Sequence, residues 1–432
     1  MPVGERSATM NPQLRTVSQV IAVLLIPCAL LVMAPTPLLA GPKKKPAAAA
    51  EDNSPKKVKI DTSVLVWPSP PYIPRVRWMG YYTGMKIDYT PAKQKKQKQG
   101  WMDRLAGAQQ KDDKQILKDF PWQLIGPYGI AIDSKGQVYV ADQRVGAVFI
   151  FNTETHDVSL IKNGTDAKFG LINGLAIDDG DRLFVSDGKL RRVLVFDASH
   201  KVTGVVDEGM QDPNGLAIDT ENRLLYVVDT SQDQVLVYDA DSYKLLRRIG
   251  TGGKNHFLTD PGNFGAPSNV AVDKDGNVYV TDTMNNRVEI FDADGGFISW
   301  FGKHGDGPGY FARPKGIAVD SDGHIWVVDQ MEDRVQVFNR EGQLLTYFGE
   351  HGNYPGQFAS AVGIAIDKQN RVFVTDQYPG RMQMFRYITD AEADAERAKR
   401  AEEQKKKSGG AQAQTPAEAP KSTAQAGAPQ TH

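Results

Sequence analysis

The stretch Gly316–Asp320 reads GIAVD, and it is followed by IWVVD at Ile325–Asp329 and by RVQVF at Arg334–Phe338. A turn-forming Ser-Asp-Gly at Ser321–Gly323 separates the first two segments. Short apolar runs of this kind, bounded by turn residues, are typical of antiparallel strands joined by tight turns.

The same pattern occurs six times along the chain. Its first segment ends in an aspartate in every copy, and these residues are Asp133, Asp178, Asp219, Asp273, Asp320 and Asp367. Its second segment also ends in an aspartate, and these residues are Asp142, Asp187, Asp229, Asp282, Asp329 and Asp376. Successive copies lie 41 to 54 residues apart, which is close to the length of a four-stranded propeller blade. No helical pattern alternates with the strands, so we predict an all-β fold, a six-bladed β-propeller of four-stranded antiparallel blades.

The repeated motif carries a family resemblance. Pro-x-Gly-[Ile/Val]-Ala-[Ile/Val]-Asp, then Val-x-Asp, then Arg-Val-x-Val-Phe resembles the NHL repeat, and it extends from about Val64 to Tyr387. The fourth copy departs from the motif, because Asn269 stands in place of its first glycine, and Ala147 and Gln234 replace the arginine in two other copies. The resemblance implies a six-bladed propeller of the bacterial exported type.

The last copy lacks a fourth strand, since it ends at Phe385–Tyr387. A strand-like segment, Arg75–Gly80, lies before the first copy. We predict that it pairs with Arg381–Tyr387, so that an N-terminal strand closes the ring and covers the open edges.

The N-terminal 40 residues indicate export. Arg15 precedes the apolar stretch Val20–Ala34, and small residues near Ala40 resemble a signal-peptidase site. The segment 1–40 is therefore a signal peptide or an uncleaved membrane anchor, and the folded part is periplasmic or extracellular. Cys28 is the only cysteine and lies within this segment, which excludes disulfides, cysteine zinc sites and cysteine nucleophiles from the fold.

The remaining chain divides by composition. Residues 41–62 read as a linker, 63–388 as the propeller with a helical insertion at 92–118, and 389–432 as a low-complexity tail that is helical or disordered. The chain holds 51 basic and 52 acidic residues, so no overall charge attracts nucleic acid. A membrane contact is expected only through the N-terminal segment, if that segment stays uncleaved.

The four strands of a blade are named a to d from the inside outward. The top face carries the b–c turns and the connections from strand d to the next strand a. A residue type that every blade repeats serves the blade, so we expect the twelve aspartates to cap turns. A functional site should break the repeat, as Asn173, Asn214 and Asn269 do at the start of strand a.

The connections on the top face differ in length, and such loops usually carry recognition. We predict that His256, Phe257, Tyr310 and Tyr354, together with Lys315 and the three asparagines, form a surface that binds an envelope protein or polymer. This prediction includes no catalytic residue, no metal and no cofactor.

The alternative is a metal-dependent propeller enzyme. Calcium-dependent lactonases with six blades hold the ion with Asn, Asp and Glu, a role open to Asn214, Asn269 and Asp282. NHL-type amidating lyases use zinc, for which His304 and His351 are candidates, although two outer-loop histidines are too far apart to share an ion unless both reach inward. The sequence contains none of the motifs His-Glu-x-x-His, Gly-x-Ser-x-Gly or Gly-x-x-x-x-Gly-Lys-[Ser/Thr].

Overall fold

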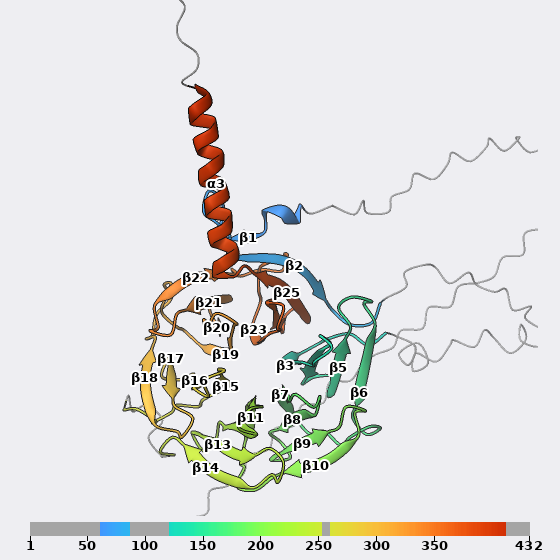
Figure 1. The fold of residues 1–432 in the computed structure, drawn as a ribbon. Coiled ribbons are helices and arrows are strands. Elements are labelled where there is room, and N and C mark those ends of the chain that lie inside the picture. The colour runs from blue at the N-terminus through green and yellow to red at the C-terminus, as the bar shows by residue number, and fades with distance from the viewer. Residues whose placement is uncertain (1–60, 87–120, 253–259, 412–432) are drawn as a thin grey trace, which may run out of the picture. The chain divides into compact units, whose positions relative to one another are not determined.

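The computed structural model describes residues 61–86, 121–252 and 260–411. Within these residues, six antiparallel sheets stand side by side around a ring (Figure 1), as the sequence predicts for a six-bladed propeller. Five sheets have four strands, and the sixth has five because the short strand β1 joins its outer edge.

The strands follow one another in blade order. Blade 1 contains β3 (Pro127–Ile132), β4 (Val138–Asp142), β5 (Ala147–Phe151) and β6 (Val158–Lys162). Blade 2 contains β7 (Ile172–Ile177), β8 (Leu183–Asp187), β9 (Arg192–Phe196) and β10 (Val202–Val206). Blade 3 contains β11 (Pro213–Asp219), β12 (Leu224–Asp229), β13 (Gln234–Asp239) and β14 (Leu245–Ile249).

The second half of the ring repeats this order. Blade 4 contains β15 (Asn269–Val272), β16 (Val278–Asp282), β17 (Arg287–Phe291) and β18 (Phe297–Phe301). Blade 5 contains β19 (Pro314–Val319), β20 (Ile325–Asp329), β21 (Arg334–Phe338) and β22 (Leu344–Phe348). Blade 6 contains β23 (Ala361–Ile366), β24 (Arg371–Asp376), β25 (Arg381–Tyr387) and the N-terminal β2 (Val76–Tyr82), with β1 (Val66–Trp67) beside β2 and the 3-10 helix η1 (Thr62–Val64) before it.

The hydrophobic core lies between the blades. Six clusters of buried side chains each join two neighbouring sheets. The cluster between blades 5 and 6, for example, packs Trp326 and Phe348 against Val374 and Phe385, all at most 1% exposed. Strands b and c are buried on both faces, which explains why their sequences are continuous apolar runs rather than alternating ones.

The ring closes as predicted. Strand β2 pairs with β25 in antiparallel register, from Val76 opposite Tyr387 to Tyr82 opposite Met382. The side chain of Trp78 is buried in the closing sheet, and its indole N–H donates to Gln383 Oε1 at 3.0 Å. Chain ends that are separated by about 300 residues therefore share one blade.

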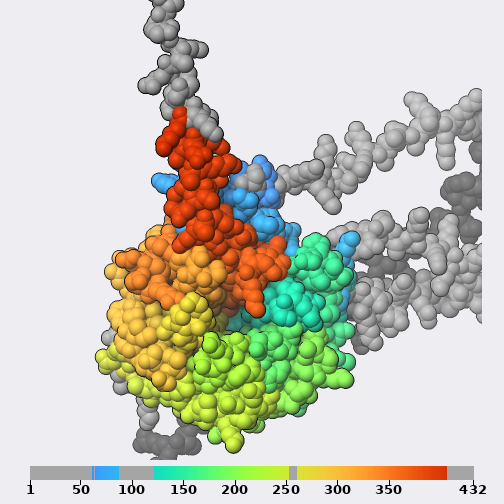
Figure 2. Space-filling view, in the orientation of Figure 1, coloured from blue at the N-terminus to red at the C-terminus, as the bar shows by residue number. Residues whose placement is uncertain are grey.

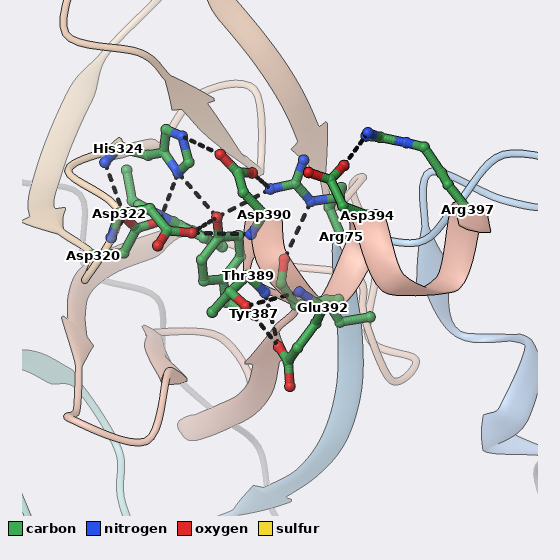
Figure 3. A network of polar contacts seen from close by, with 12 residues as sticks. Arg75, Asp320, Asp322, His324, Tyr387, Thr389, Asp390, Glu392, Asp394 and Arg397 are labelled. Carbon is green, nitrogen blue, oxygen red and sulfur yellow. Dashed lines mark hydrogen bonds and ion pairs between the residues drawn. The ribbon is translucent and has the colours of Figure 1, made fainter. Parts of the chain in front are cut away.

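The closing strand, the last strand and the C-terminal helix α3 (Asp390–Ala411) meet in one polar network, shown in Figure 3. Arg75 pairs with Asp390, and its guanidinium also donates to the Tyr387 hydroxyl at 3.0 Å. The hairpin of blade 5 joins in, since Tyr387 donates to Asp322 at 2.8 Å and contacts His324 at 3.0 Å.

The first turn of α3 forms a capping box. The backbone N–H of Glu392 donates to Thr389 Oγ1 at 3.3 Å, and the backbone N–H of Thr389 donates to the Glu392 carboxylate at 2.9 Å. Ala393 is fully buried, whereas most later residues of the helix are exposed. In the space-filling view the helix lies beside the N-terminal segment and rises from the rim of the ring (Figure 2).

Several predictions fall on residues that are not described. The signal peptide or anchor at 1–40, most of the linker at 41–62, the helical insertion at 92–118, and His256 and Phe257 lie outside the described residues. The tail at 389–432 is helical up to Ala411. No helix in the described part of the chain is long and apolar enough to cross a membrane.

Candidate functional site

The centre of the ring is closed by an apolar plug. Each innermost strand contributes the aliphatic residue that follows the motif glycine, and these residues are Ile130, Leu175, Leu216, Val270, Ile317 and Ile364. All six are between 2% and 8% exposed, and the cavity between them measures about 50 Å³. A space of this size holds a few water molecules at most, so the channel is divided into a top mouth and a bottom mouth.

The motif glycines allow the innermost strands to approach closely. A Cβ on Gly129 would lie 2.1 Å from the carbonyl oxygen of Asn173, and a Cβ on Gly174 would lie 2.3 Å from that of Asn214. Blade 4 differs, because Asn269 occupies the glycine position and is the only polar side chain among those that line the 50 Å³ cavity. The departure noted in the sequence therefore lies at the plug.

The top mouth is formed by the residues that precede the motif glycine, one from each blade. In blade order they are Tyr128, Asn173, Asn214, Ser268, Lys315 and Val362. The asparagine side chains form hydrogen bonds within the propeller. Asn173 accepts from Gln143 Nε2 at 2.8 Å and donates to the Pro213 carbonyl at 3.0 Å, so it links the blades on either side of it.

Asn214 and Asn269 differ in the hydrogen bonds that their side-chain oxygens accept. The Asn214 amide nitrogen donates to Thr230 Oγ1 at 3.2 Å, while its Oδ1 is buried and has no hydrogen-bond partner among the described residues. Asn269 Oδ1 accepts from the backbone N–H of Val270 at 2.9 Å. Of the three asparagines, Asn214 is thus the one with a buried side-chain oxygen that has no partner among the described residues.

Two of these residues, Tyr128 and Lys315, have shifted pKa values. Burial raises the pKa of Tyr128 in blade 1, while the amide of Asn214 in blade 3 and the guanidinium of Arg313, which precedes blade 5, act in the opposite direction. Burial and the same guanidinium lower the pKa of Lys315 to about 8. Both Tyr128 and Lys315 remain partly exposed to solvent, as expected for side chains that line a concave mouth.

The repeated aspartates cap turns. Those that end strand b are completely buried, and Asp142 is representative, with hydrogen bonds from four backbone N–H groups at Ile125, Gly126, Arg144 and Val145. Pairing with the arginine five residues later occurs only in blades 4 and 6, where the pairs are Asp282–Arg287 and Asp376–Arg381. The six aspartates that end strand b are thus accounted for by the scaffold.

Of the residues considered for a calcium ion, Asp282 already has other hydrogen-bond partners. Asp282 Oδ1 accepts from the Gly265 N–H at 2.6 Å, and Oδ2 accepts from Asn285 and Arg287 at 2.8 Å each. This carboxylate is fully buried and already neutralised, so it is not available to join Asn214 and Asn269 around a cation. Among the described residues, no group of three or more His, Cys, Asp and Glu side chains is placed to hold a metal ion.

The candidate zinc histidines also serve other contacts. His351 lies 2.6 Å from Asp333 through Nδ1, and its side chain is 83% exposed. His304 is exposed as well, in a connection held by a bridge to Phe311. Neither side chain is buried at the channel mouth.

The described parts of the top connections combine buried anchors with exposed aromatic rings. Phe264, Phe311 and Phe358 are at most 2% exposed, so these in-phase residues belong to the core. Tyr354 is 73% exposed and Tyr310 is 37% exposed, with the Lys303 ammonium 4.6 Å from the Tyr310 ring centroid. The non-repeating tyrosines are therefore accessible.

A groove adjoins Tyr354. It measures about 410 Å³ and lies where the connection between blades 5 and 6 meets β1, with Trp67, Tyr347 and Pro355 among its lining residues. No local sequence pattern indicates this groove, because Trp67 precedes the repeat and comes to blade 5 only through ring closure. The rings of Trp67 and Phe348 pack in a tilted arrangement, with 5.7 Å between their centroids.

Comparison with known proteins gives a partial family match. The model of the SMP-30/Gluconolactonase/LRE-like region matches residues 178–301 and 278–377, which together cover less than half of the chain. No curated protein sequence gives a significant match. The chain is therefore similar to this family from β8 in blade 2 to β24 in blade 6, and its repeats form a β-propeller.

Solved structures with similar folds are distant. A virginiamycin B lyase from Staphylococcus aureus is 14% identical, with 61% of this chain and 96% of that chain covered and a TM-score of 0.46. A gluconolactonase from Xanthomonas campestris is 20% identical, with 63% and 91% covered and a TM-score of 0.48. An auxiliary nutrient binding protein from Bacteroides thetaiotaomicron is 14% identical, with 61% and 69% covered and a TM-score of 0.49.

Proposed function

We propose that this chain is an exported propeller of the NHL type, which acts in the cell envelope as a scaffold and binds a protein or polymer through the connections of its top face. The observation that carries the proposal is the groove beside Tyr354. It presents three aromatic side chains, Trp67, Tyr347 and Tyr354, and a proline within one concave surface. Exposed aromatic rings on a rigid scaffold are the side chains that most often anchor an interface.

The contrast between the two faces supports this proposal. The bottom mouth forms a depression of about 280 Å³, but its aspartates are occupied by hairpin turns, as in Asp133, which accepts from the N–H groups of Lys135 and Gln137. The top face instead carries the accessible Tyr310 and Tyr354 and connections of unequal length. Recognition is therefore expected on the top face.

Site-specific crosslinking in cells tests the proposal. A photoreactive amino acid at position 354 or 310 should trap a discrete partner, whereas the same residue at Lys135 or Lys368 in the bottom hairpins should not. Lys368 lines the bottom depression and is a matched exposed control. Equal crosslinking yields from both faces would contradict the proposal.

The family match favours one alternative, a hydrolase that acts on a lactone. The matched model includes gluconolactonases by its description. A metal-dependent enzyme of this kind should retain one calcium or zinc ion per chain after dialysis. We expect metal analysis of the purified protein to find none at that level, and a stoichiometric ion that is lost in Asn269→Ala would support the enzyme instead.

A further inference from the structure

A second groove lies where helix α3 leaves the closing blade, and it measures about 510 Å³. It is separate from the groove beside Tyr354 and from the depression at the bottom mouth, since the three cavities share no lining residue. Strands β2 and β25 line it with Arg77, Met79 and Arg386. Helix α3 supplies the remaining charged side chains of the lining.

The helix lines the groove with one of its faces. Glu392, Glu396 and Arg400 are four residues apart and all line the groove, so they lie on the same side of α3. Glu396 and Arg400 are partly buried, whereas Arg397 and Lys399 between them are exposed. The face of α3 that turns toward the blade is therefore polar, and it carries both signs of charge.

The groove contains three guanidinium groups, and two of them already have a carboxylate. Arg386 donates to Glu392 at 2.9 Å, which joins the last strand to the first turn of α3 shown in Figure 3. Arg400 donates to Glu396 at 2.9 Å. No ion pair and no hydrogen bond joins the side chain of Arg77 to another residue of the described chain, and this side chain is exposed. The groove thus has one guanidinium without a counter-ion.

The unpaired guanidinium stands beside a paired one. Arg77 and Arg386 are directly opposite each other in the antiparallel pairing of β2 with β25. Residues in such a pair have Cβ atoms about 4.5–5.5 Å apart, and like charges there repel each other. An anionic group bound between them would relieve this repulsion, and the planar donor fork of arginine fits a carboxylate.

Apolar side chains lie next to these charges. Met79 is 50% exposed, and Ile73, Pro74 and Ile388 are partly buried in the lining. They offer a ligand an apolar contact beside the cationic one. Glu396 accepts from Arg400 through Oε1, so its Oε2 can accept from an N–H donor. A peptide has such donors, whereas a hydrocarbon chain would desolvate the charged face of α3 without replacing its hydrogen bonds with water.

We propose that this groove binds a peptide segment of a partner protein in which a carboxylate stands next to an apolar side chain. The carboxylate contacts Arg77 and Arg386, and the apolar side chain packs against Met79 and Ile388. The proposal goes beyond the docking of a partner on the top face, because it concerns a different surface. Crosslinking at position 354 does not probe this groove, so either proposal can fail without the other.

Four probes test the proposal on the purified full-length protein. Acetyl-Leu-Glu-Leu-amide has a side-chain carboxylate, acetyl-Leu-Gln-Leu has a C-terminal one, and acetyl-Leu-Gln-Leu-amide is their uncharged counterpart. Octanoate carries a carboxylate on a hydrocarbon chain. Ligand-observed NMR should show about 10-fold tighter binding of one or both acidic peptides than of the uncharged peptide. The tighter acidic peptide identifies the source of the carboxylate. Equal or absent binding of the three peptides would overturn the proposal, and so would octanoate binding as tight as that of the acidic peptides.

Variants place the carboxylate in the groove. Arg77→Met should weaken binding of the acidic peptide about 10-fold, and Arg77→Lys, which keeps the charge, should restore most of it. Lys244→Met is the matched control, because Lys244 is an exposed cation just before strand d of blade 3, and it should leave binding unchanged. Equal losses in Arg77→Met and Lys244→Met would show that the peptide does not bind at this groove.

A change of the opposite sign separates charge from structure. Glu396→Gln removes a negative charge from the groove and should tighten binding of the acidic peptide about 3-fold, while binding of the uncharged peptide stays the same. Raising sodium chloride from about 0.05 M to about 0.5 M should weaken the acidic peptide and not the uncharged one. If Glu396→Gln weakens the acidic peptide as Arg77→Met does, the charge of the groove does not select the ligand and the proposal is wrong.

Discussion

In blades 4, 5 and 6, one side chain of strand c binds the top connection that precedes the blade. The residue occupies the same position in each strand, but its chemical group in blade 4 differs from that in blades 5 and 6. In blade 5 the Gly309 N–H donates to Gln336 Oε1 at 2.7 Å, and Gln336 Nε2 donates to the Tyr310 carbonyl at 2.7 Å. Blade 6 repeats this with Gln383, which accepts from Gly356 at 2.9 Å and donates to the Gln357 carbonyl at 2.6 Å. A neutral amide thus holds each loop at any pH.

Blade 4 has a carboxyl group in place of this amide. Glu289 accepts from the Gly262 N–H at 2.8 Å and pairs with Arg287 at 2.5 Å, and Arg287 also pairs with Asp282 at 2.8 Å. All three side chains are at most 3% exposed. Two buried carboxyl groups therefore share one guanidinium.

Burial changes the protonation of the pair, against the effect of the shared cation. Burial raises the pKa of Asp282 and raises that of Glu289 to about 7, where the neighbouring Asp282 acts in the same direction. Where blades 5 and 6 have glutamine, blade 4 has glutamate. We therefore expect the contact between strand c of blade 4 and the longest top connection to depend on pH. Blades 5 and 6 have no ionisable group at this position of strand c.

The largest expected effect follows from removing the shared cation. Arg287→Leu leaves Asp282 and Glu289 buried without a positive partner, and breaking a buried ion pair from one side costs about 3–5 kcal/mol. Arg334→Leu is the matched change in blade 5, where the arginine is partly exposed and pairs with Glu332 rather than with Asp329. It should cost about 1 kcal/mol or less. Urea-induced unfolding measures both, and equal losses would show that blade 4 is not special.

A second change transfers the carboxyl group to blade 5. Gln336→Glu places an ionisable group at a fully buried position, with Arg334 already engaged by Glu332. Its expected cost is about 3 kcal/mol at pH 8, because the buried carboxylate lacks a cation and its hydrogen bond to the Tyr310 carbonyl is lost. The cost should shrink toward pH 5, where a protonated carboxyl can donate to that carbonyl.

The control for this experiment is Gln336→Met, which removes both hydrogen bonds without adding a titratable group. Its cost should be the same at pH 5 and pH 8. A pH-independent cost for Gln336→Glu as well would mean that this position is not as dry in solution as its burial indicates.

Much of the fold could be predicted from the sequence because its determinants repeat. Glycine, aliphatic residue and aspartate recur in phase, and the missing fourth strand of the last copy pointed to the closing pairing with Arg75–Gly80. The position x of Arg-Val-x-Val-Phe also carries information about burial. Phe149, Leu194 and Leu236 occupy that position in blades 1 to 3, which indicates that Glu289 would be buried as well.

The sites were predicted less completely. Lys315 belongs to the predicted top-face surface, whereas Arg313 lies just before β19, at a position that the repeat does not mark. The groove at Tyr354 needs Trp67, which no local pattern places beside blade 5. Sequence periodicity reports which face of a strand is buried, and it does not report which side chains from distant connections converge.

The last prediction concerns the pH dependence that Glu289 alone confers. Its pKa in the folded protein, about 7, lies above the ordinary value of 4.5, so the folded state binds the proton more tightly than the unfolded state does. Such a group contributes stability that is fully present below pH 4.5 and is lost as pH rises through 7. The wild-type protein should therefore lose on the order of 2 kcal/mol more stability between pH 5 and pH 8 than Glu289→Gln does, in which blade 4 acquires the amide of blades 5 and 6.

Asp329 and Asp376 also have raised pKa values and contribute to the pH dependence of both proteins, so only the difference between the two unfolding curves is informative. Gln383 in blade 6 already shows that an amide can accept from the loop glycine beside a paired arginine, and the variant should accordingly match or exceed the wild type at pH 8. If the two proteins lose stability in parallel, the proton of the buried pair resides on Asp282, and Glu289 is held as a permanent carboxylate by Arg287 and Gly262.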